Sequence, residues 1–246
     1  MTGTPIEEFI DIPTHHGTMQ TFIARPRGPS PTCAILYMDV FGLREELFEL
    51  AREYARRGIT AVVPDLFHRL PVSRFTPVND EGGPLAVEAK EANMSTELEM
   101  TVAYTKALTT TLGMSHGFSI PPRFFALGYC MGGRHALAAC EAFPDEFIGG
   151  ISAHGGRLVT PDTQSPHLLV PRIKVPFHFA FAADDPTCPD AHCATLKDSA
   201  GDSSAPVTFT LHTAHHGWSF PCRWSYDWAA AKAVHDMAVA MIKAAD

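Results

Sequence analysis

The stretch Phe124-Phe-Ala-Leu-Gly-Tyr-Cys-Met-Gly-Gly133 changes character at its centre. It opens with four apolar residues, typical of a short buried strand, and continues as Gly128-Tyr-Cys-Met-Gly132. A helical pattern follows and ends near Phe143, just before Pro144. A strand, a reactive side chain flanked by glycines and a helix, in this order, predict a sharp turn that lifts Cys130 clear of a sheet.

This turn gives Cys130 surroundings that suit a nucleophile. Met131 opens the helix, so its backbone N–H and the positive end of the helix dipole can face an oxyanion. The same helix end favours the thiolate, which is the reactive form of a cysteine. The opposing interpretation is a buried cysteine in a glycine-rich turn. A nucleophile would need a base and an orienting acid further along the chain.

Two doublets can supply the acid and the base. Asp184-Asp185 follows one predicted strand, and His215-His216 follows the last predicted strand. Because the carboxyl ends of parallel strands meet at one edge of a sheet, both doublets are expected near Cys130. The order nucleophile, acid, histidine is that of a catalytic triad on such a sheet. Plain alternatives are a turn or helix cap for the aspartates and a polar loop for the histidines.

The rest of the chain alternates strands with helices. We expect strands at 9–12, 19–24, 33–38, 59–63, 124–127, 147–152, 177–182 and 207–211. We expect helices at 47–57, from 96 onward with Ala103 on the apolar face, at 131–143 and at 224–244, with Trp228 in the core. This alternation predicts a doubly wound, mostly parallel sheet with helices on both faces, in a single domain over residues 1–246.

Residues 69–94 break the periodic pattern. Pro71, Pro77, Gly82, Gly83 and Pro84 interrupt every regular spacing. Long irregular segments inside compact domains usually serve a function, so we expect a lid or substrate loop over the site.

The composition bounds the class of protein. A chain of 246 residues that is 46% apolar suits a well-buried core. A formal net charge of −8 argues against nucleic acid and anionic membranes as partners. No apolar run reaches the roughly 18 residues of a membrane span. The first eleven residues lack the basic segment of a signal peptide, so we expect a cytoplasmic protein with six free thiols.

These segments resemble the dienelactone hydrolase family, whose members have the α/β-hydrolase fold. The resemblance runs from about residue 9 to the last helix, and its most specific part is the turn with cysteine. The matching segments are Met38-Asp-Val-Phe-Gly-Leu43, Val63-Pro-Asp-Leu66, Gly128-Tyr-Cys-Met-Gly-Gly133, Asp185 with Pro189 four residues on, and His216-Gly-Trp218.

The resemblance implies a role for each matching residue. Cys130 would be the nucleophile, Asp185 the acid and His216 the base. The backbone N–H groups of Val40 and Met131 would form the oxyanion hole. The implied reaction is hydrolysis of an enol-lactone or a related activated ester through an acyl-cysteine. The substrate would be a small molecule, no cofactor or metal is implied, and the protein would be a monomer or a small homo-oligomer.

Two departures from the family pattern concern substrate binding and control of the thiol. Dienelactone hydrolases in the strict sense carry a glutamate, which keeps the resting thiol neutral, where this chain has Asp39. Asp39 is therefore either a thiol-modulating group with a shorter reach or a buried structural carboxylate. The prototype enzymes also bind the substrate carboxylate with an arginine at the position of Phe220. Candidate substrate-binding residues here are Arg44, Arg69, Arg134, Trp218 and Arg223, with a surface or structural charge as the alternative role of the arginines.

Other functions fit parts of the pattern. The same residues would serve a thioesterase or a general carboxylesterase. An alternative of another class is a non-catalytic ligand-binding or regulatory protein that keeps the fold, because fold alone proves no activity. Cys188, His192 and Cys193 do not have the spacing of a standard zinc site.

Overall fold

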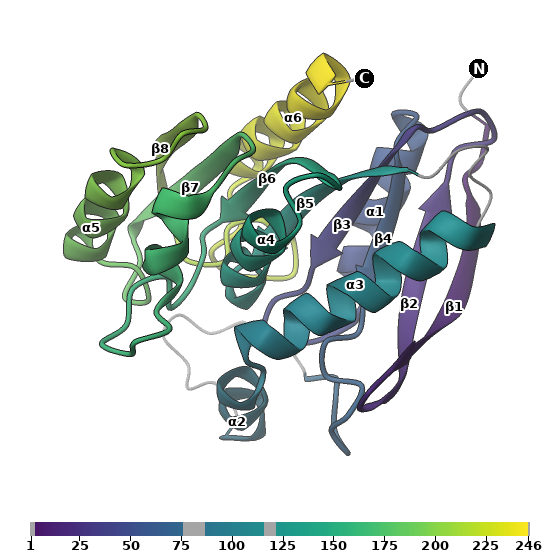
Figure 1. The fold of residues 1–246 in the computed structure, drawn as a ribbon, viewed down its shortest axis with the longest axis horizontal. Coiled ribbons are helices and arrows are strands. Elements are labelled where there is room, and N and C mark those ends of the chain that lie inside the picture. The colour runs from purple at the N-terminus through teal and green to yellow at the C-terminus, as the bar shows by residue number, and fades with distance from the viewer. Residues whose placement is uncertain (1–2, 76–86, 116–121, 246) are drawn as a thin grey trace.

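The computed structural model describes residues 3–75, 87–115 and 122–245, and its centre is an eight-stranded sheet (Figure 1). The strand order is β1-β2-β4-β3-β5-β6-β7-β8. β2 is antiparallel to β1 and β4, and all other neighbours are parallel. The strands are β1 (Ile6–Thr14), β2 (Gly17–Arg25), β3 (Thr32–Tyr37), β4 (Thr60–Pro64), β5 (Arg123–Tyr129), β6 (Phe147–Ala153), β7 (Phe177–Asp184) and β8 (Val207–His215).

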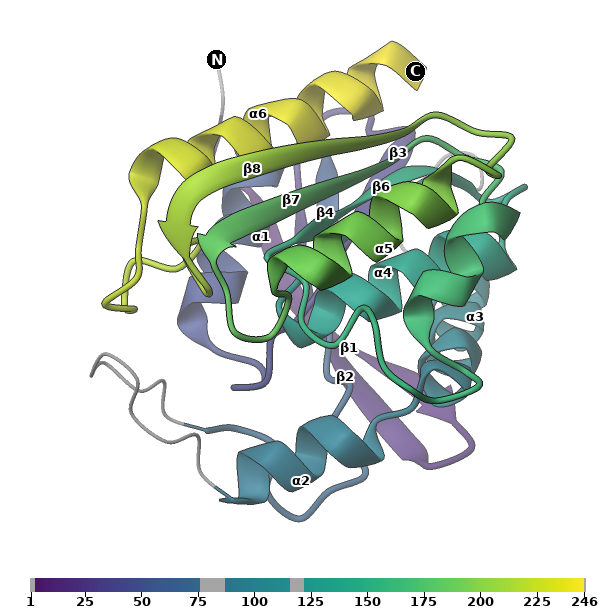
Figure 2. The same ribbon diagram turned by 90° about the vertical axis from the view of Figure 1, so that its left-hand side faces the viewer.

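Helices cover both faces of this sheet, as Figures 1 and 2 show. One face carries α1 (Glu45–Arg56) and α6 (Trp228–Ala245). The other carries α3 (Leu98–Ser115), α4 (Met131–Ala142) and α5 (Asp190–Ala200), with a short 3-10 helix at Pro166–Arg172 against α4 and α5. The predicted doubly wound fold is therefore confirmed. In the part of the chain that the structure describes, no helix is both long and apolar enough to cross a bilayer.

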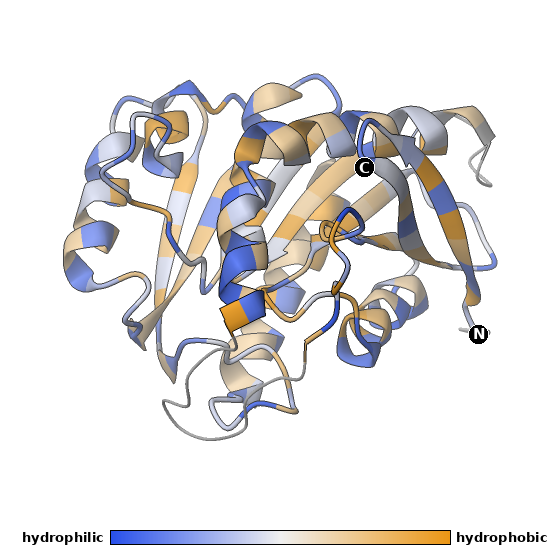
Figure 3. Cartoon of the chain, turned by 90° about the horizontal axis from the view of Figure 1, so that it is seen from below, coloured by the Kyte–Doolittle hydropathy of each residue, from blue (hydrophilic) through white to orange (hydrophobic). Residues whose placement is uncertain are grey.

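The central strands lie between the two helical layers. Every residue of β3 and β4 is buried, whereas the edge strand β8 is half exposed. Figure 3 shows the same division, with apolar strands inside and blue polar segments on the outer helices. Because β3, β5, β7 and β8 run parallel, the residues that follow them meet at one edge of the sheet.

Three glycines let α4 pack directly on the sheet. A Cβ atom on Gly128 would lie 2.0 Å from the carbonyl oxygen of Gly132, and one on Gly132 would lie 2.2 Å from that of Tyr37. A Cβ atom on Gly133 would lie 2.3 Å from the Oγ of Ser152. These distances are far below any normal contact, so the turn between β5 and α4 admits no side chain at these three positions.

The segment expected to be irregular contains a helix, α2 (Val87–Ser95). The prediction of an unbroken loop over 69–94 is wrong here, because the run Glu88-Ala-Lys-Glu-Ala92 consists of strong helix formers. The prolines and glycines that dominate the segment precede this run. Residues 76–86 of the predicted loop lie outside the described residues.

The helix after α2 differs from the prediction at its start and on its buried face. α3 begins at Leu98, because the Thr96 hydroxyl donates to the Ala92 carbonyl oxygen (2.8 Å) and so belongs to the end of α2. Ala103 is exposed. The buried face carries Tyr104 and Leu108 as the apolar spacing predicts, but it also carries three threonines, Thr101, Thr105 and Thr109. The Thr105 hydroxyl lies 2.8 Å from the Tyr37 hydroxyl, so these polar side chains are buried with partners that a search for apolar spacing overlooks.

The last helix begins four residues later than expected. The side chain of Asp227 accepts the Ala230 N–H (2.8 Å), which makes Asp227 the N-cap of α6. Trp228 then occupies the first turn on the outer side and is 64% exposed, so its expected place in the core is wrong. The buried face of α6 begins only at Ala230.

Gly132→Ala should be far more disruptive than an alanine at a glycine with free space around it. A methyl group on Gly132 must displace the end of β3, so we expect a loss of about 3 kcal/mol of unfolding free energy or a failure to fold. Among the described residues, no atom lies within 4 Å of the place that a methyl group on Gly113 of α3 would take. Gly113→Ala should therefore stabilise by about 0.5–1 kcal/mol. Urea unfolding of both variants checks this, and equal midpoints would contradict the packing described.

Candidate active site

Cys130 occupies a strained position between β5 and α4. Its φ of 51° and ψ of −114° are unusual for a residue with a side chain. Backbone hydrogen bonds impose this conformation: the Cys130 N–H donates to Ala153 (3.1 Å), and its carbonyl oxygen accepts from Gly133 (3.0 Å) and Gly156 (2.9 Å). Such over-determined strain is typical of functional sites, and here it holds a partly exposed thiol at the edge of the sheet.

One histidine joins the thiol to a buried carboxylate. The Nε2 atom of His216 lies 3.0 Å from the Sγ atom of Cys130, and its Nδ1 atom lies 2.7 Å from Oδ2 of Asp185. The Asp185 side chain is 1% exposed. The neighbouring residues of each doublet, His215 and Asp184, pair with each other in solvent. The structure thus brings together Cys130, His216 and Asp185. The other two members of the doublets lie outside this site.

Thr187 is a residue of this site that the sequence reasoning missed. Its backbone N–H (2.8 Å) and its hydroxyl (2.7 Å) both donate to Oδ1 of Asp185. The same hydroxyl lies 3.2 Å from Nδ1 of His216. Both oxygens of the Asp185 carboxylate are therefore fixed, which orients the imidazole. The available signal was the hydroxyl two residues after an aspartate, the spacing of a local side-chain turn.

The charges of the three groups support one another. Burial alone would lower the pKa of His216, but the negative charge of Cys130 and the hydrogen bonds to Asp185 and Cys130 raise it to about 10. Burial opposes ionisation of Asp185, yet the hydrogen bond and charge of His216, with the two bonds from Thr187, hold its pKa below the ordinary value.

His154 packs against the imidazole of His216, and it is a second residue of the site that the sequence reasoning missed. It follows β6 in the left-handed region (φ 38°) and is fully buried. Its ring lies edge-on to His216 with the centroids 5.2 Å apart, and 4.8 Å from Trp218. Its Nε2 atom lies 2.9 Å from the Ser219 hydroxyl. Burial and the charge of His216 hold its pKa well below the ordinary value, so His154 is a neutral, aromatic support.

The two expected oxyanion donors lie on neighbouring segments. Met131 is the first residue of α4, and Val40 lies two residues after Met38, in the loop that leaves β3. The packing of Gly132 against the Tyr37 and Met38 carbonyls sets the start of α4 beside this loop. Val40 and Met131 are both buried. We call residues 39–43 the oxyanion loop.

Asp39 holds this loop through its side chain. Its Oδ1 atom accepts the Phe41 N–H (3.1 Å), and its two oxygens bind the Arg44 guanidinium at 2.5 and 2.8 Å. The Arg44 guanidinium lies 4.3 Å above the ring of Phe220, the residue at the family's arginine position. No contact in the described part of the chain joins Asp39 to Cys130, so the contacts favour the structural role; the thiol-modulating role stays a prediction.

The other candidate substrate-binding residues separate into two groups. Arg223 lies at the oxyanion loop, with its guanidinium 4.7 Å from the centre of the Phe41 ring. Arg69 and Arg134 instead donate to the end of α2. Trp218 is completely buried beside His154, where it packs and does not face solvent.

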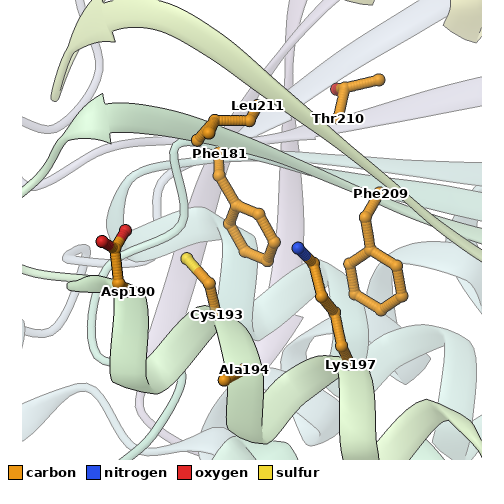
Figure 4. Close-up of a pocket in the computed structure, with 8 residues that line it drawn as sticks. All are labelled: Phe181, Asp190, Cys193, Ala194, Lys197, Phe209, Thr210 and Leu211. Carbon is orange, nitrogen blue, oxygen red and sulfur yellow. The ribbon is translucent and has the colours of Figure 1, made fainter.

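A surface pocket of about 250 Å³ lies elsewhere, between α5 and the strands β7 and β8 (Figure 4). Figure 4 shows Lys197 and Cys193 of α5 facing the rings of Phe181 and Phe209. The lining residues are Phe181, Asp190, Cys193, Ala194, Lys197, Phe209, Thr210 and Leu211. None of these residues belongs to the Cys130 site, so the pocket is separate from it.

The sheet order, the strained turn after β5, the acid after β7 and the histidine after β8 define an α/β-hydrolase. The sequence model of the dienelactone hydrolase family matches residues 19–245. The chain therefore belongs to the dienelactone hydrolase family, and it is a hydrolase of that family.

Individual relatives are distant. A provisionally named carboxymethylenebutenolidase of Methylorubrum extorquens is 24% identical over 225 residues, which cover 88% of this chain and 74% of the relative. A carboxymethylenebutenolidase of Rhodococcus opacus is 29% identical over 153 residues, with 62% and 52% covered. A crystal structure from Klebsiella pneumoniae, provisionally named a dienelactone hydrolase, has a TM-score of 0.85 at 20% identity and covers 98% of this chain and 99% of that one. At this identity the structure shows a common fold.

The raised pKa of His216 predicts how its contribution to stability depends on pH. The pKa rises from an ordinary 6.5 in the unfolded chain to about 10 in the folded protein. The stabilisation is therefore complete below about pH 6.5 and is lost as the pH rises toward 10. Because forming the ion pair also removes the proton of the Cys130 thiol, the measurement is made in a Cys130→Ser background, where the unfolding free energy relative to the Cys130→Ser/His216→Gln double variant should fall as the pH rises above 6.5. A difference that does not change with pH would contradict the charge assignment.

Proposed function

We propose that this protein hydrolyses lactones or activated carboxylic esters through an acyl-cysteine on Cys130. The observation that carries the proposal is the 3.0 Å contact between Nε2 of His216 and Sγ of Cys130, continued by the 2.7 Å contact to Asp185. A nucleophile, a base and an orienting acid in contact are what covalent acyl transfer requires. The distant similarity to carboxymethylenebutenolidases supports the same reaction class.

In the first half of the reaction, the Cys130 sulfur attacks the carbonyl carbon of the substrate. The carbonyl oxygen becomes an oxyanion, and the N–H groups of Val40 and Met131 stabilise it. When the tetrahedral intermediate collapses, the bond to the leaving alkoxide breaks and the His216 imidazolium gives its proton to that oxygen. In a lactone the leaving hydroxyl stays attached to the acyl group.

In the second half, water attacks the thioester carbonyl and His216 takes the proton of that water. The second intermediate collapses with Cys130 thiolate as the leaving group, which restores the starting state. Asp185 keeps the Nδ1 atom of His216 protonated, so that Nε2 faces the reaction in both halves. Thr187 holds this carboxylate in place.

The substrate is a small molecule, and two arginines can bind a substrate carboxylate. Arg223 lies beside the oxyanion loop at Phe41, whereas the guanidinium of Arg44 already pairs with Asp39. Arg223 is therefore the better candidate. The six free cysteines support a reducing compartment such as the cytoplasm.

The rival functions make different predictions for simple substrates. A thioesterase or general carboxylesterase would use the same residues but prefer thioesters or unstrained esters to lactones. A non-catalytic binding protein would give neither turnover nor a burst of product. A hydrolysis screen over lactones, oxygen esters and thioesters with the same acyl group separates these outcomes.

Cys130→Ala should abolish turnover while leaving the fold intact, because this thiol forms the acyl bond. The rate should fall by at least about 10³-fold. Cys222→Ala, which removes the other partly exposed thiol, should keep the wild-type rate. Alkylation and peptide mapping should mark Cys130 before Cys33 and Cys140, whose burial raises their thiol pKa values. A Cys130→Ala variant with more than a tenth of the wild-type rate would contradict the assignment of Cys130 as the nucleophile.

Each doublet offers its own control for the acid and the base. His216→Gln and Asp185→Asn should each lower kcat by about 10²-fold or more, since they remove general acid–base catalysis or its orientation. His215→Gln and Asp184→Asn alter the solvent-exposed pair and should leave kcat nearly unchanged. Steady-state kinetics of the four variants decide which member of each doublet is catalytic. An inactive His215→Gln variant would mean that His215 and not His216 is the base.

A further inference from the structure

Arg134 is a buried cation on the same helix as the nucleophile, four residues after Cys130. It is 7% exposed, and no carboxylate among the described residues pairs with it. Burial lowers its pKa to about 10, which leaves the guanidinium charged at neutral pH. Burying an unpaired cation costs several kcal/mol, so its contacts are expected to serve a purpose.

The hydrogen bonds that Arg134 makes within the described residues all go to the end of α2. Its Nη2 atom donates to the carbonyl oxygen (2.9 Å) and the side-chain oxygen (2.9 Å) of Asn93 and to the carbonyl oxygen of Thr96 (3.5 Å). Arg69 donates to Ser95 at the same end. Cations at the C-terminus of a helix stabilise its dipole and satisfy its last carbonyl groups.

Within the residues that the structure describes, helix α2 has little else to hold it. It is nine residues long, a length at which a helix alone is marginal in water, and it buries only Ala89 and Ala92. Two buried methyl groups stabilise it by only about 1–2 kcal/mol. Figures 1 and 2 show α2 outside the two helical layers that cover the sheet. The arginine contacts therefore decide whether α2 stays docked.

The docked helix covers the oxyanion loop. Ala89 is fully buried in a small apolar cluster with Val40 and Phe41, against which Phe75 packs. The Phe75 N–H also donates to the Phe41 carbonyl oxygen (2.9 Å). Val40 supplies one of the proposed oxyanion donors, so α2 packs on the residue whose backbone must stay in place during the reaction.

We propose that Arg134 is a positioning residue that clamps α2 to the nucleophile helix α4 and thereby holds Val40 in the oxyanion hole. The role of Val40 rests on the proposed function, but the clamp itself does not. Cys130 and Val40 lie on different segments, and Arg134 connects them by a route that does not pass through the sheet. Releasing the clamp leaves the triad intact and loosens one oxyanion donor.

Arg134→Gln tests the clamp and its consequence separately. Hydrogen exchange of the backbone amides of 87–95 should become about 10-fold faster or more, because bonds from a charged donor are lost. The kcat for an activated ester should fall about 10-fold with little change in KM, since an oxyanion donor acts mainly in the transition state. Arg172→Gln is the matched control. It removes an exposed guanidinium that binds Glu141 at the other end of α4, and it should change neither readout.

Two further variants keep the test decisive. Ala89→Asp places a charge against Val40 and Phe41 and should expel α2 without altering α4, so it should reproduce both effects even if Arg134→Gln fails to fold. Arg134→Lys keeps the charge but loses the planar fork, and it should retain most of the kinetic defect. If the Arg134→Lys variant has the wild-type kcat while the backbone amides of α2 still exchange fast, the charge at this position and not the clamp supports catalysis. The proposal would then be wrong.

The outcomes distinguish this proposal from the proposed function. Unchanged exchange at 87–95 in Arg134→Gln overturns the clamp, and fast exchange with unchanged kcat overturns its link to the oxyanion hole. Neither result affects the Cys130 assignment, because an inactive Cys130→Ala variant supports that assignment independently. Exchange at 87–95 can also be measured if Cys130→Ala proves active.

Discussion

The close approach of α4 to the ends of β3 and β5 is the constraint on which the site depends. It requires glycine at 128 and 132, where any side chain would overlap backbone carbonyl oxygens. It also forces Cys130 into a left-handed conformation that hydrogen bonds from two other segments maintain. The same approach sets the first turn of α4 beside the oxyanion loop. Packing, strain and the proposed chemistry thus have one origin.

Charge in the site is arranged in a line from solvent to core. The sulfur of Cys130 is partly exposed, His216 is largely buried and Asp185 is almost completely buried. His216 and Asp185 stabilise each other in their charged forms, and Thr187 satisfies the last carboxylate oxygen. A hydrogen-bonded chain of this kind avoids the cost of an isolated buried charge. On the other side of the imidazole, the neutral ring of His154 leaves this line of charge undisturbed.

The sequence predicted best where local chemistry and packing agree. The eight strands, the turn at Cys130 and the helix that ends before Gly58 follow from apolar runs and glycine spacing. It predicted α2 poorly, because a short polar helix buries two alanines and depends on arginines far along the chain. His154 was missed because its contacts with Trp218 and Ser219 join distant loops, whereas Thr187 was missed although its spacing after Asp185 is that of a local side-chain turn. Arg134 was one of several candidate substrate-binding residues, with a structural charge as the alternative, but a single sequence cannot show that its partners lie at the end of α2.

The central claim is a covalent acyl-cysteine on Cys130, and trapping that species tests it most directly. The protein is mixed with excess p-nitrophenyl acetate, quenched in acid within the first turnovers and digested for mass spectrometry. We expect one acetyl group on the peptide that contains Cys130, formed in step with a burst of nitrophenol and released on further incubation. Turnover without any acyl adduct on Cys130, or with the adduct on another residue, would contradict the account.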